Sequence, residues 1–356
     1  MSAPAKANSK APATERMVDE IRRDLLGGRT APSDYLPGER DLAARYGVGR
    51  GTVRRALKRL VAEGLVRPER GHGYRALLKS AGEKPGSPLV FVSNVEHRGP
   101  AEADGGVAAV VQDMLVRAES QVMTVGVRGR PAEEVMRIIA DAGAWGVLVE
   151  NNSRALHELL HQSGLPCVAV DAVTDDLPMD CVLQDNHGGA RAAAEHLIGK
   201  GHRKIGWLGD VTESRHSLER FTGAQAALLK HGLEMRREHV VADAGDPEAA
   251  RRLLSGNDRP TAVLAMWRMR TAHVARAARE LGLEIGRDLD VAGWTTQDGY
   301  RSLMEEEFAG GRRPAMVVWD HRDMAAVALE RIELRRRNPQ LRTVRINIPV
   351  RLVPGL

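Results

Sequence analysis

The stretch that decides the fold of the first domain is LPGERDLAARYGVGRGTVRRALKRLVAEGLV, residues 36–66. The pattern predicts a short helix from Arg40 to Tyr46, a tight turn at Gly47, and a second helix from Arg50 to Glu63. In the second helix one face is apolar and the other faces are basic. The apolar positions are Val53, Ala56, Leu57, Leu60 and Val61, and the basic positions are Arg50, Arg54, Arg55, Lys58 and Arg59. We therefore expect a helix-turn-helix whose outer helix is basic.

The flanking residues complete a small domain. The segment RMVDEIRRDLL, residues 16–26, carries apolar residues at helical spacing and ends at a pair of glycines, so it predicts a preceding helix. On the other side, LVRPERGHGYRAL at residues 65–77 predicts two short strands around Gly71-His72-Gly73, which is a hairpin wing. We expect a winged helix-turn-helix over residues 15–76, after a disordered tail at residues 1–14.

Positive charge is concentrated in this first part of the chain. Residues 1–80 contain 17 Lys and Arg against 9 Asp and Glu, whereas the rest contains 35 against 38. Such an asymmetry is expected when one domain binds a nucleic acid and the other does not. Over all 356 residues, 43% are hydrophobic and 28% are charged, which is typical of folded globular domains.

The sequence contains no signal for membrane insertion or export. No stretch approaches the roughly 18 to 20 apolar residues that span a bilayer, and the first residues lack the apolar run of a secretion signal. Cys167 and Cys181 lie in apolar runs without Cys-x-x-Cys spacing, so we expect both to be core residues. A cytoplasmic protein without a membrane partner is the resulting expectation.

A second domain is predicted after a linker. Residues 77–88 are rich in Ser, Gly and Pro, as flexible linkers are. From Leu89 onward, short apolar runs such as LVFVS, GVLVE, PCVAV, KIGWL and AMVVW alternate with helical segments. Buried strands that alternate with amphipathic helices predict a parallel sheet covered on both faces. The number of strands over residues 89–356 predicts two doubly wound lobes, so the fold class is α/β.

The residues of the first domain resemble a known family. The stretch from Leu36 to Val66 is similar to the winged helix-turn-helix of gluconate-repressor-like (GntR) regulators, and the resemblance covers about residues 15–75. It implies DNA contacts from the arginine after the first glutamate, from the start of the second helix and from the wing tip. These positions are Arg40, Gly49, Arg50, Gly51, Thr52, Arg54, Arg70 and Gly71.

The helix start can be given roles on physical grounds. Residues at the start of a groove-bound helix reach base edges, so Arg50 is expected to read a base, and an arginine can bind guanine through two hydrogen bonds. We expect Arg40, Thr52, Arg54 and Arg70 to contact phosphates. The family usually has Ser at position 38 and Ser or Thr at position 49, where this chain has Gly. Glycine caps a helix only a few tenths of a kcal/mol less well than serine.

Two other interpretations of this segment are open. The basic helix could be a solvated face of an ordinary three-helix domain. The glycines between Gly47 and Gly51 could form a nucleotide-binding turn, but no strand precedes them. Neither interpretation accounts for the match to the whole winged domain.

The chain from Leu89 to its end resembles the effector-binding domain of lactose- and galactose-repressor (LacI/GalR) regulators, which is related to periplasmic binding proteins. The best stretch is VLQDNHGGARAAAEHLIGKGHRKIGWLGD, residues 182–210. Parallel sheets present ligands to the carboxyl ends of their strands, so the residues that follow each apolar run are candidates, and the resemblance adds Arg220 and supports Asp185. The predicted effector-binding residues are Asn94, Asp171, Asp185, Arg220, Trp267, Arg268, Trp294, Thr295 and Trp319. Aromatic faces beside amides and carboxylates favour a sugar or a sugar derivative.

Two departures from that family concern the effector. Relatives commonly have Asn-Asp where this chain has Trp267-Arg268, and an Asp where it has Thr295. An arginine in place of an acid suggests an effector with an anionic group, such as a sugar acid or a phosphorylated sugar. The alternative is that Arg268 points to solvent or pairs with a nearby acid. The tryptophans could likewise be ordinary core residues.

One motif suggests an enzyme instead. His157-Glu158-Leu-Leu-His161 fits the H-E-x-x-H pattern of zinc peptidases, in which both histidines bind the metal and the glutamate acts as base. Its leucines, however, form the apolar stripe of an ordinary crossover helix that ends at Gly164. A zinc-dependent hydrolase is therefore the alternative hypothesis, and we expect neither a metal nor a cofactor.

Taken together, the sequence predicts a DNA-binding transcriptional regulator and not an enzyme. We expect a repressor that acts as a homodimer on a palindromic double-stranded DNA operator, controlled by a small molecule bound between two lobes. The third hypothesis is a solute-binding protein without a regulatory role, which would need an export signal and would have no use for a recognition helix.

Overall fold

The computed structural model describes most of the chain. The described residues are 13–26, 35–62, 65–69, 71–76, 87–93, 121–127, 129–150, 153–174, 177–243, 245–338 and 341–355. The chain divides into two compact units, and the first comprises the described residues of 1–98, 111–181 and 327–345. The second comprises 182–326 and 346–356 among the described residues. None of the helices in these ranges is both long and apolar enough to cross a bilayer.

The predicted winged helix-turn-helix is present in the first unit. It consists of α1 (Ala13–Leu26), α2 (Glu39–Tyr46), α3 (Arg50–Ala62), β1 (Val66–Glu69) and β2 (Gly73–Ala76). The strands pair antiparallel with Val66 opposite Ala76. Gly47 ends α2 with φ of 60°, a conformation that glycine adopts without strain. The buried side chains of the three helices form the core of this domain: Met17, Val18, Ile21, Leu42, Val53, Ala56, Leu57 and Leu60.

Most of the first sheet belongs to the same unit, whereas residues 182–184 of β7 and 346–348 of β13 are assigned to the second. The strand order of this sheet is β13-β7-β6-β5-β3-β4. The strands are β3 (Leu89–Ser93), β4 (Val122–Gly126), β5 (Gly146–Glu150), β6 (Cys167–Val170), β7 (Asp180–Gln184) and β13 (Arg345–Ile348). The helices around it are α5 (Ala132–Asp141), α6 (Arg154–Ser163) and α12 (His321–Arg337). Both cysteines are buried in these strands, as predicted.

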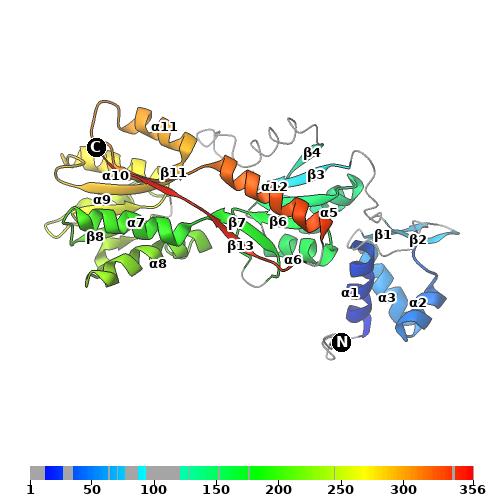
Figure 1. Ribbon diagram of the computed structural model, residues 1–356. Coiled ribbons are helices and arrows are strands. Elements are labelled where there is room, and N and C mark those ends of the chain that lie inside the picture. Colours follow the sequence, from blue (N-terminus) through cyan, green and yellow to red (C-terminus); the bar gives the residue numbers. More distant parts are fainter. Residues whose placement is uncertain are drawn as a thin grey trace. The chain divides into compact units, whose positions relative to one another are not determined.

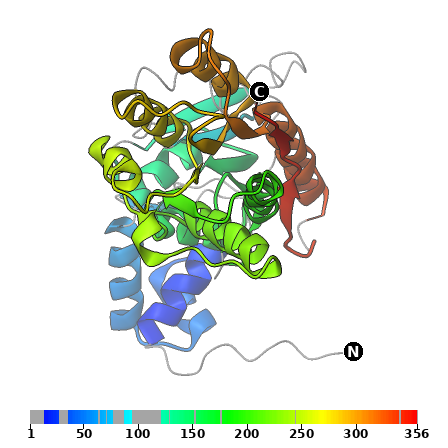
Figure 2. The same cartoon turned by 90° about the vertical axis from the view of Figure 1, so that its left-hand side faces the viewer.

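The second unit contains the second sheet, in the order β14-β12-β11-β10-β8-β9. Its strands are β8 (Ile205–Leu208), β9 (Val240–Val241), β10 (Ala262–Ala265), β11 (Asp290–Thr296), β12 (Ala315–Trp319) and β14 (Arg351–Val353). All neighbours run parallel except β14, which lies antiparallel to β12. Helices α7 (Asn186–Gly199) and α8 (Arg215–Lys230) lie on one face, and α9 (Glu248–Leu254), α10 (Arg268–Glu280) and α11 (Gln297–Glu307) lie on the other (Figures 1 and 2). The predicted fold class, a winged helix-turn-helix followed by a two-lobed parallel α/β domain, is confirmed.

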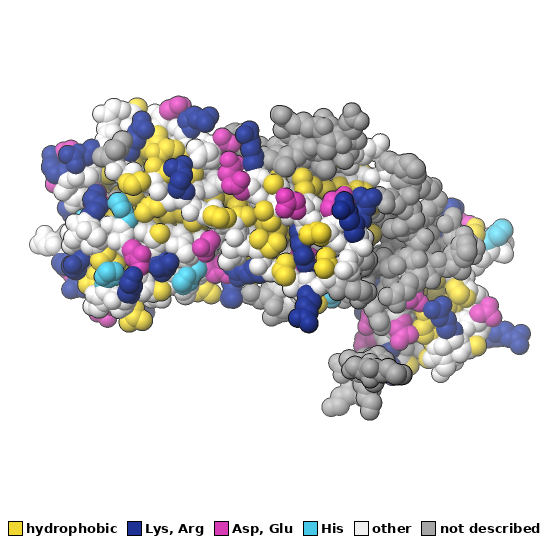
Figure 3. Space-filling model, viewed as in Figure 1, with side chains coloured by type: hydrophobic (Ala, Val, Ile, Leu, Met, Phe, Trp, Pro, Cys, Tyr) yellow, Lys and Arg dark blue, Asp and Glu magenta, His cyan; other side chains and the backbone are white. Residues whose placement is uncertain are grey.

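Burial explains why these strands are almost purely apolar. Helices cover both faces, so successive side chains of β8, β10 and β12 are all buried although they point to opposite sides. Buried polar and charged side chains are instead found at strand ends, as at Gln184, and on the covering helices, as at Arg220 and His273. In the space-filling view, basic and acidic side chains are interspersed over the second unit (Figure 3).

The buried carboxylate of Asp180, in β7, joins this strand to α12 and to the segment before β13. Asp180 has no exposed surface, and its carboxylate accepts hydrogen bonds from Arg331 at 2.9 Å, Arg335 at 2.6 Å and the backbone N–H of Val344 at 2.7 Å. Burial alone would raise the pKa of Asp180, but the hydrogen bonds from Arg335 and Arg331 outweigh it and lower the pKa below its usual value. The ionised carboxylate is thus part of the folded state.

The Asp180 cluster predicts an acid-sensitive stability. A carboxyl group whose pKa is depressed by folding stabilises the protein above its unfolded pKa of about 3.9, and this contribution is lost as the pH falls through the folded pKa. Asp180→Asn should lower the free energy of unfolding by about 3 to 5 kcal/mol at pH 7, because Arg331 and Arg335, whose side chains are 12% and 13% exposed, lose their counter-ion. Its stability should then fall less between pH 5 and pH 3 than that of the unmodified chain, as urea unfolding would measure.

The matched control is Asp141→Asn, which removes an exposed carboxylate at the end of α5. This variant should keep the pH dependence of the unmodified chain. If the free energy of unfolding depended on pH in the same way for the Asp180→Asn and Asp141→Asn variants, the stabilising role of the ionised Asp180 would be contradicted.

Candidate functional site

The start of α3 is exposed and basic. Arg50, Gly51 and Arg54 are exposed, Thr52 is half-buried, and Gly49 precedes them at the surface. The backbone carbonyl of Gly49 accepts hydrogen bonds from the N–H groups of Thr52 at 2.9 Å and Val53 at 3.2 Å, so glycine starts this helix without a side-chain cap. The structure thus places the predicted residues of this helix on one accessible end.

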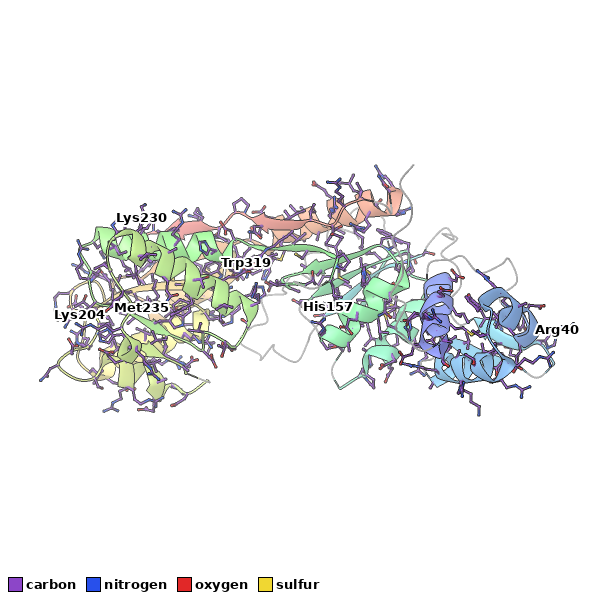
Figure 4. The ribbon with its side chains drawn as sticks, turned by 90° about the horizontal axis from the view of Figure 1, so that it is seen from below. Arg40, His157, Lys204, Lys230, Met235 and Trp319 are labelled. Atoms are coloured by element: carbon purple, nitrogen blue, oxygen red, sulfur yellow. The ribbon has the colours of Figure 1, made fainter. Side chains whose placement is uncertain are left out.

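The first turn of α2 adjoins that end. Arg40 is exposed at the outer end of the domain (Figure 4). Glu39 beside it accepts a hydrogen bond from Nε of Arg54 at 2.9 Å, which joins the start of α2 to α3. Arg40 and the exposed residues at the start of α3 therefore belong to one basic surface. Within this surface, the carboxylate of Glu39 pairs with Arg54.

The wing contributes a residue that the sequence argument missed. Gly71 lies at the turn between β1 and β2 with φ of 85°, and the next residue, His72, is exposed. The imidazole of His72 stacks on the ring of Tyr35, with ring centroids 5.9 Å apart, and the hydroxyl of Tyr35 donates to Glu69 at 2.6 Å. The Gly-His-Gly pattern could have indicated this position, since it puts the middle residue at the tip. Arg70 lies outside the described residues.

The carboxyl ends of the first sheet hold a small polar set. The hydroxyl of Ser93, at the end of β3, donates to Glu150 at the end of β5 at 2.7 Å, and both side chains are buried. Asp171 follows β6 with φ of 50°, the only non-glycine residue with positive φ among the described residues. Asn94 lies outside them. Of the predicted residues in this sheet, the structure thus places Asp171 at the expected strand end.

In the second unit, Asp185 begins α7. Its carboxylate accepts a hydrogen bond from the N–H of Gly188 at 2.9 Å, which is a helix N-cap. The next residue, Asn186, is buried and accepts a hydrogen bond from Nε of Arg220 at 2.8 Å. Asp185 is therefore engaged in starting the helix, and Asn186 is the direct link from α7 to Arg220.

Arg220 is the centre of an aromatic cluster. It is 2% exposed, and its guanidinium carbon lies 4.1 Å from the ring centre of Trp294 and 4.6 Å from that of Trp267. Its Nη1 donates to the carbonyl of Met266 at 3.2 Å. The structure therefore brings together three predicted effector residues, one from α8, one from β11 and one from the start of α10.

Trp294 points toward α7, where a side chain on Gly189 would lie 2.8 Å from the indole, so glycine is needed for the ring to fit. Thr295 and Trp319, the other two predicted residues on β11 and β12, lie away from Arg220. Successive side chains of a strand alternate, so Thr295 is buried on the opposite face, beside α10 and α11. Trp319, at the end of β12, is buried and packs edge-on against His321 at 4.5 Å.

Arg268 forms an ion pair instead of standing alone at the edge of the sheet. Its Nη2 lies 3.0 and 3.2 Å from the two carboxylate oxygens of Glu306 in α11. Of the alternatives stated for Arg268, pairing with a nearby acid is the one that this geometry shows. The side chain of Arg268 is 15% exposed, whereas that of Glu306 is 59% exposed, so the pair lies at the surface.

A second arginine on the same helix was not predicted as functional. The Nε of Arg270 lies 2.9 Å from both oxygens of Asp243, and its Nη2 lies 2.5 Å from Glu213. Burial lowers the pKa of Arg270, but these carboxylates outweigh it and raise the pKa above its usual value. Asp243 and Glu213 come from the loops after β9 and β8, so Arg270 ties three strand ends together.

The H-E-x-x-H motif lies on α6. His157 is buried without a hydrogen bond at Nε2 among the described residues, and burial lowers its pKa. Glu158 pairs with Arg154 at 2.7 Å, and His161 is exposed (Figure 4 labels His157). In the described part of the chain, no three His, Cys, Asp or Glu side chains are grouped to hold a metal ion.

Comparison with known families matches both parts of the chain. The family described as "Bacterial regulatory proteins, gntR family" matches residues 13–75. The family described as "Periplasmic binding protein-like domain" matches residues 194–356.

Individual relatives that match the chain are named as transcriptional repressors. The chain is 30% identical over 168 residues to the "HTH-type transcriptional repressor PurR" of Mannheimia succiniciproducens, and this match covers 45% of the chain and half the length of that relative. It is 23% identical over 311 residues to the "Arabinose metabolism transcriptional repressor" of Geobacillus stearothermophilus, covering 78% of the chain and 80% of the relative.

Solved structures share the fold. A "transcriptional regulator CelR-cellobiose complex" has a TM-score of 0.65 at 23% identity, covering 90% of this chain and 99% of that one. A "putative ribose operon repressor from Burkholderia thailandensis" has a TM-score of 0.60 at 22% identity, covering 76% and 99%.

The Arg270 cluster predicts a large loss of stability. Arg270→Leu leaves the buried Asp243 carboxylate without its partner, and such a loss costs about 3 to 5 kcal/mol. The double variant Arg270→Leu/Asp243→Leu should recover most of that loss, because no buried charge remains. Urea unfolding of the three proteins measures the difference. The exposed pair Arg252–Asp246 is the control, since Arg252→Leu should cost less than about 1 kcal/mol.

Proposed function

We propose that this chain is a sequence-specific DNA-binding transcriptional repressor whose DNA affinity is controlled by a small-molecule effector. The observation that carries the proposal is the exposed basic start of α3 on a winged helix-turn-helix. A buried face holds α3 in the domain through Val53, Leu57 and Leu60, which leaves its first turn free for a DNA groove. The named relatives, which are repressors, support the same function.

The proposed DNA contacts divide into two kinds. Arg50 reads a base edge from the first turn of α3. Arg40, Thr52, Arg54 and Arg70 bind phosphates, and Gly49, Gly51 and Gly71 allow the backbone to approach the DNA. On binding, Arg54 exchanges its carboxylate partner Glu39 for a phosphate. His72 at the wing tip joins this set as an additional contact.

The head is assigned to the GntR type and the second domain to the LacI/GalR type. The match of the gntR family to residues 13–75 supports the first assignment, and the match of the periplasmic binding protein-like domain supports the second. The arabinose repressor supports the combination, since its match extends over 311 residues.

The proposed effector is a sugar or a sugar derivative. Support comes from relatives named for arabinose metabolism and a ribose operon, and from a neighbour solved with cellobiose. The proposed contacts are Asn94, Asp171, Asp185, Arg220, Trp267, Arg268, Trp294, Thr295 and Trp319. An effector that binds one conformation better than another shifts the population and thereby the occupancy of the operator.

The remaining parts of the proposal follow from repressor function. Two copies of the chain bind a palindromic operator as a homodimer, because a two-fold symmetric protein matches a two-fold symmetric site. The operator is in the cytoplasm, so the protein acts there, without a cofactor, a metal or enzymatic activity. The zinc hydrolase alternative would require about one zinc per purified chain, which elemental analysis measures.

The test is a gel-shift assay with the Arg50→Ala variant on the promoter DNA beside its own gene. Loss of the bidentate hydrogen bonds from Arg50 to a base should weaken specific binding by about 1 to 3 kcal/mol and relax the sequence preference. The matched control is Arg59→Ala. Arg59 lies in the last turn of α3, 3.8 Å from Glu15 of α1, and away from the proposed groove. Equal losses for the two variants, or none for Arg50→Ala, would contradict base reading by Arg50.

Phosphate binding predicts a different signature. Arg54→Gln should weaken specific and non-specific binding alike and should reduce the slope of log affinity against log salt by about one. Glu39→Gln should raise the affinity for DNA, because Arg54 then binds a phosphate without first breaking its ion pair with Glu39. Fluorescence anisotropy over a range of salt concentrations measures both slopes, and an unchanged slope for Arg54→Gln would refute the phosphate contact.

A further inference from the structure

We propose that the arginines at the end of α12 form a second DNA-binding surface, which binds phosphates outside the contacts of the winged helix-turn-helix. This surface, called here the α12 arginine surface, consists of the exposed side chains of Arg337, Arg342 and Arg345. The inference rests on the proposed function, since it adds contacts to the same DNA from the first lobe.

Positive charge is dense at this end of α12. Residues 331–345 contain six arginines and one acid, Glu333, although residues 81–356 contain 35 Lys and Arg against 38 Asp and Glu. The carboxylate of Glu333 lies 3.0 Å from Arg336 and 4.0 Å from Arg337, whose side chain is 78% exposed. Because one carboxylate is shared between two arginines, the segment keeps an excess of positive charge at the surface.

The less exposed arginines of the segment hold it in one arrangement. Arg331 and Arg335 both bind the buried carboxylate of Asp180 at the start of β7. Arg331 also donates to the backbone carbonyl of Arg342 at 2.6 Å. The N–H of Val344 donates to Asp180 at 2.7 Å. The chain that follows α12 is therefore bound against the last turns of the helix, so the exposed arginines before and after it belong to one surface.

The end of a helix does not by itself account for these arginines. The negative end of a helix dipole favours basic side chains in the last turn, where Arg335, Arg336 and Arg337 lie. Arg342 and Arg345 come after the helix, where this effect has decayed. All six basic residues of the segment are arginines, and a planar guanidinium can bind a phosphate through two hydrogen bonds. The composition therefore favours a partner that carries phosphates.

The surface adjoins the point at which the chain enters the first lobe. The carbonyl of Pro88, directly before β3, accepts a hydrogen bond from the N–H of Trp145 at 3.1 Å. The guanidinium carbon of Arg336 lies 4.7 Å from the ring centre of Trp145. At the start of β5, a side chain on Gly146 would lie 3.0 Å from Ile332 of α12. The end of α12 and the entry point of the chain therefore lie at the same edge of the first sheet.

The short connection makes DNA the partner of this surface. Residues 77–88 are the twelve residues between β2 of the wing and β3 of the first lobe. A segment of this length spans at most about 40 Å, which is close to the length of one turn of DNA, about 34 to 36 Å. A winged helix-turn-helix bound to DNA therefore keeps Pro88 within about one turn of the duplex, where phosphates supply dense negative charge.

The first experiment measures binding to the promoter DNA beside the protein's own gene, by fluorescence anisotropy over a range of salt concentrations. Arg337→Gln/Arg342→Gln should lower the affinity about tenfold at about 0.1 M salt and should reduce the slope of log affinity against log salt by about two. Arg337→Lys/Arg342→Lys keeps the charge and should keep most of the slope. The control Arg287→Gln, which changes a 62% exposed side chain of the second unit, should change neither quantity. An unchanged slope for the double Gln variant would overturn the proposal.

The second experiment locates the bound phosphates by ethylation interference on the same promoter DNA. Ethylation removes the charge of a single phosphate, so it weakens binding wherever that phosphate is contacted. Arg337→Gln/Arg342→Gln should lose interference at a set of phosphates that Arg54→Gln retains. Loss of the same set by both variants would contradict a second surface. So would interference by the unmodified chain that is confined to the phosphates of the half-sites, a result that needs no variant.

A protein partner at this surface would give different results. Leu334 and Val344 are 50% and 39% exposed in the same segment, and a protein would cover these apolar side chains, whereas phosphates would not. Leu334→Ser should therefore leave the affinity for DNA unchanged. A loss of DNA affinity equal to that of Arg337→Gln/Arg342→Gln would show that the arginines do not act through their charge, and the proposal would then be wrong.

The preference of the unmodified chain for promoter DNA over unrelated DNA is measured in parallel. If the unmodified chain shows no such preference, the proposed function fails. If the preference is present and the double Gln variant has the affinity, slope and interference pattern of the unmodified chain, this inference alone fails. The two failures are therefore distinguishable.

Discussion

The architecture depends on one constraint: the inner parallel strands of the second domain are buried on both faces. A buried strand side chain has no access to water, so charged groups along the strands would pay a desolvation cost without a partner. The strands β8, β10 and β12 accordingly contain no charged residue. The buried pair of Arg270 and Asp243 therefore lies beyond the strand ends, at a helix start and in a loop.

This constraint also explains which features could be predicted from the sequence. The helix-turn-helix was predictable because the apolar stripe of α3 repeats at helical spacing and Gly47 marks the turn. The parallel sheets were predictable because apolar runs of four to seven residues alternate with helices. Both signals are local, since they depend on neighbours within one or two helical turns. The resemblance to known regulators added the positions of Arg220 and of the DNA contacts.

The arrangement within the candidate site depended on contacts between distant segments. Arg268 meets Glu306, which is 38 residues away, and Arg220 meets Asn186, which is 34 residues away. Neither pairing leaves a periodic pattern in the sequence. Trp294 and Thr295 are adjacent in sequence, yet strand alternation places them on opposite faces of the sheet. A position at a strand end therefore indicated where chemistry is possible, but the partner of each side chain required the tertiary structure.

At the start of α10, arginines stand where acidic side chains are favoured, and each arginine requires a carboxylate partner from another element. The positive end of a helix dipole favours acidic side chains, yet the first turn of α10 contains Arg268 and Arg270 and no acid. Each arginine is instead neutralised from another element, Arg268 by Glu306 of α11, and Arg270 by Asp243 and Glu213. Because those carboxylates are bound to arginines, they are less available to a ligand. Trp267, at the same helix start, keeps an exposed ring and makes no ion pair, so it is not tied to a carboxylate as the two arginines are.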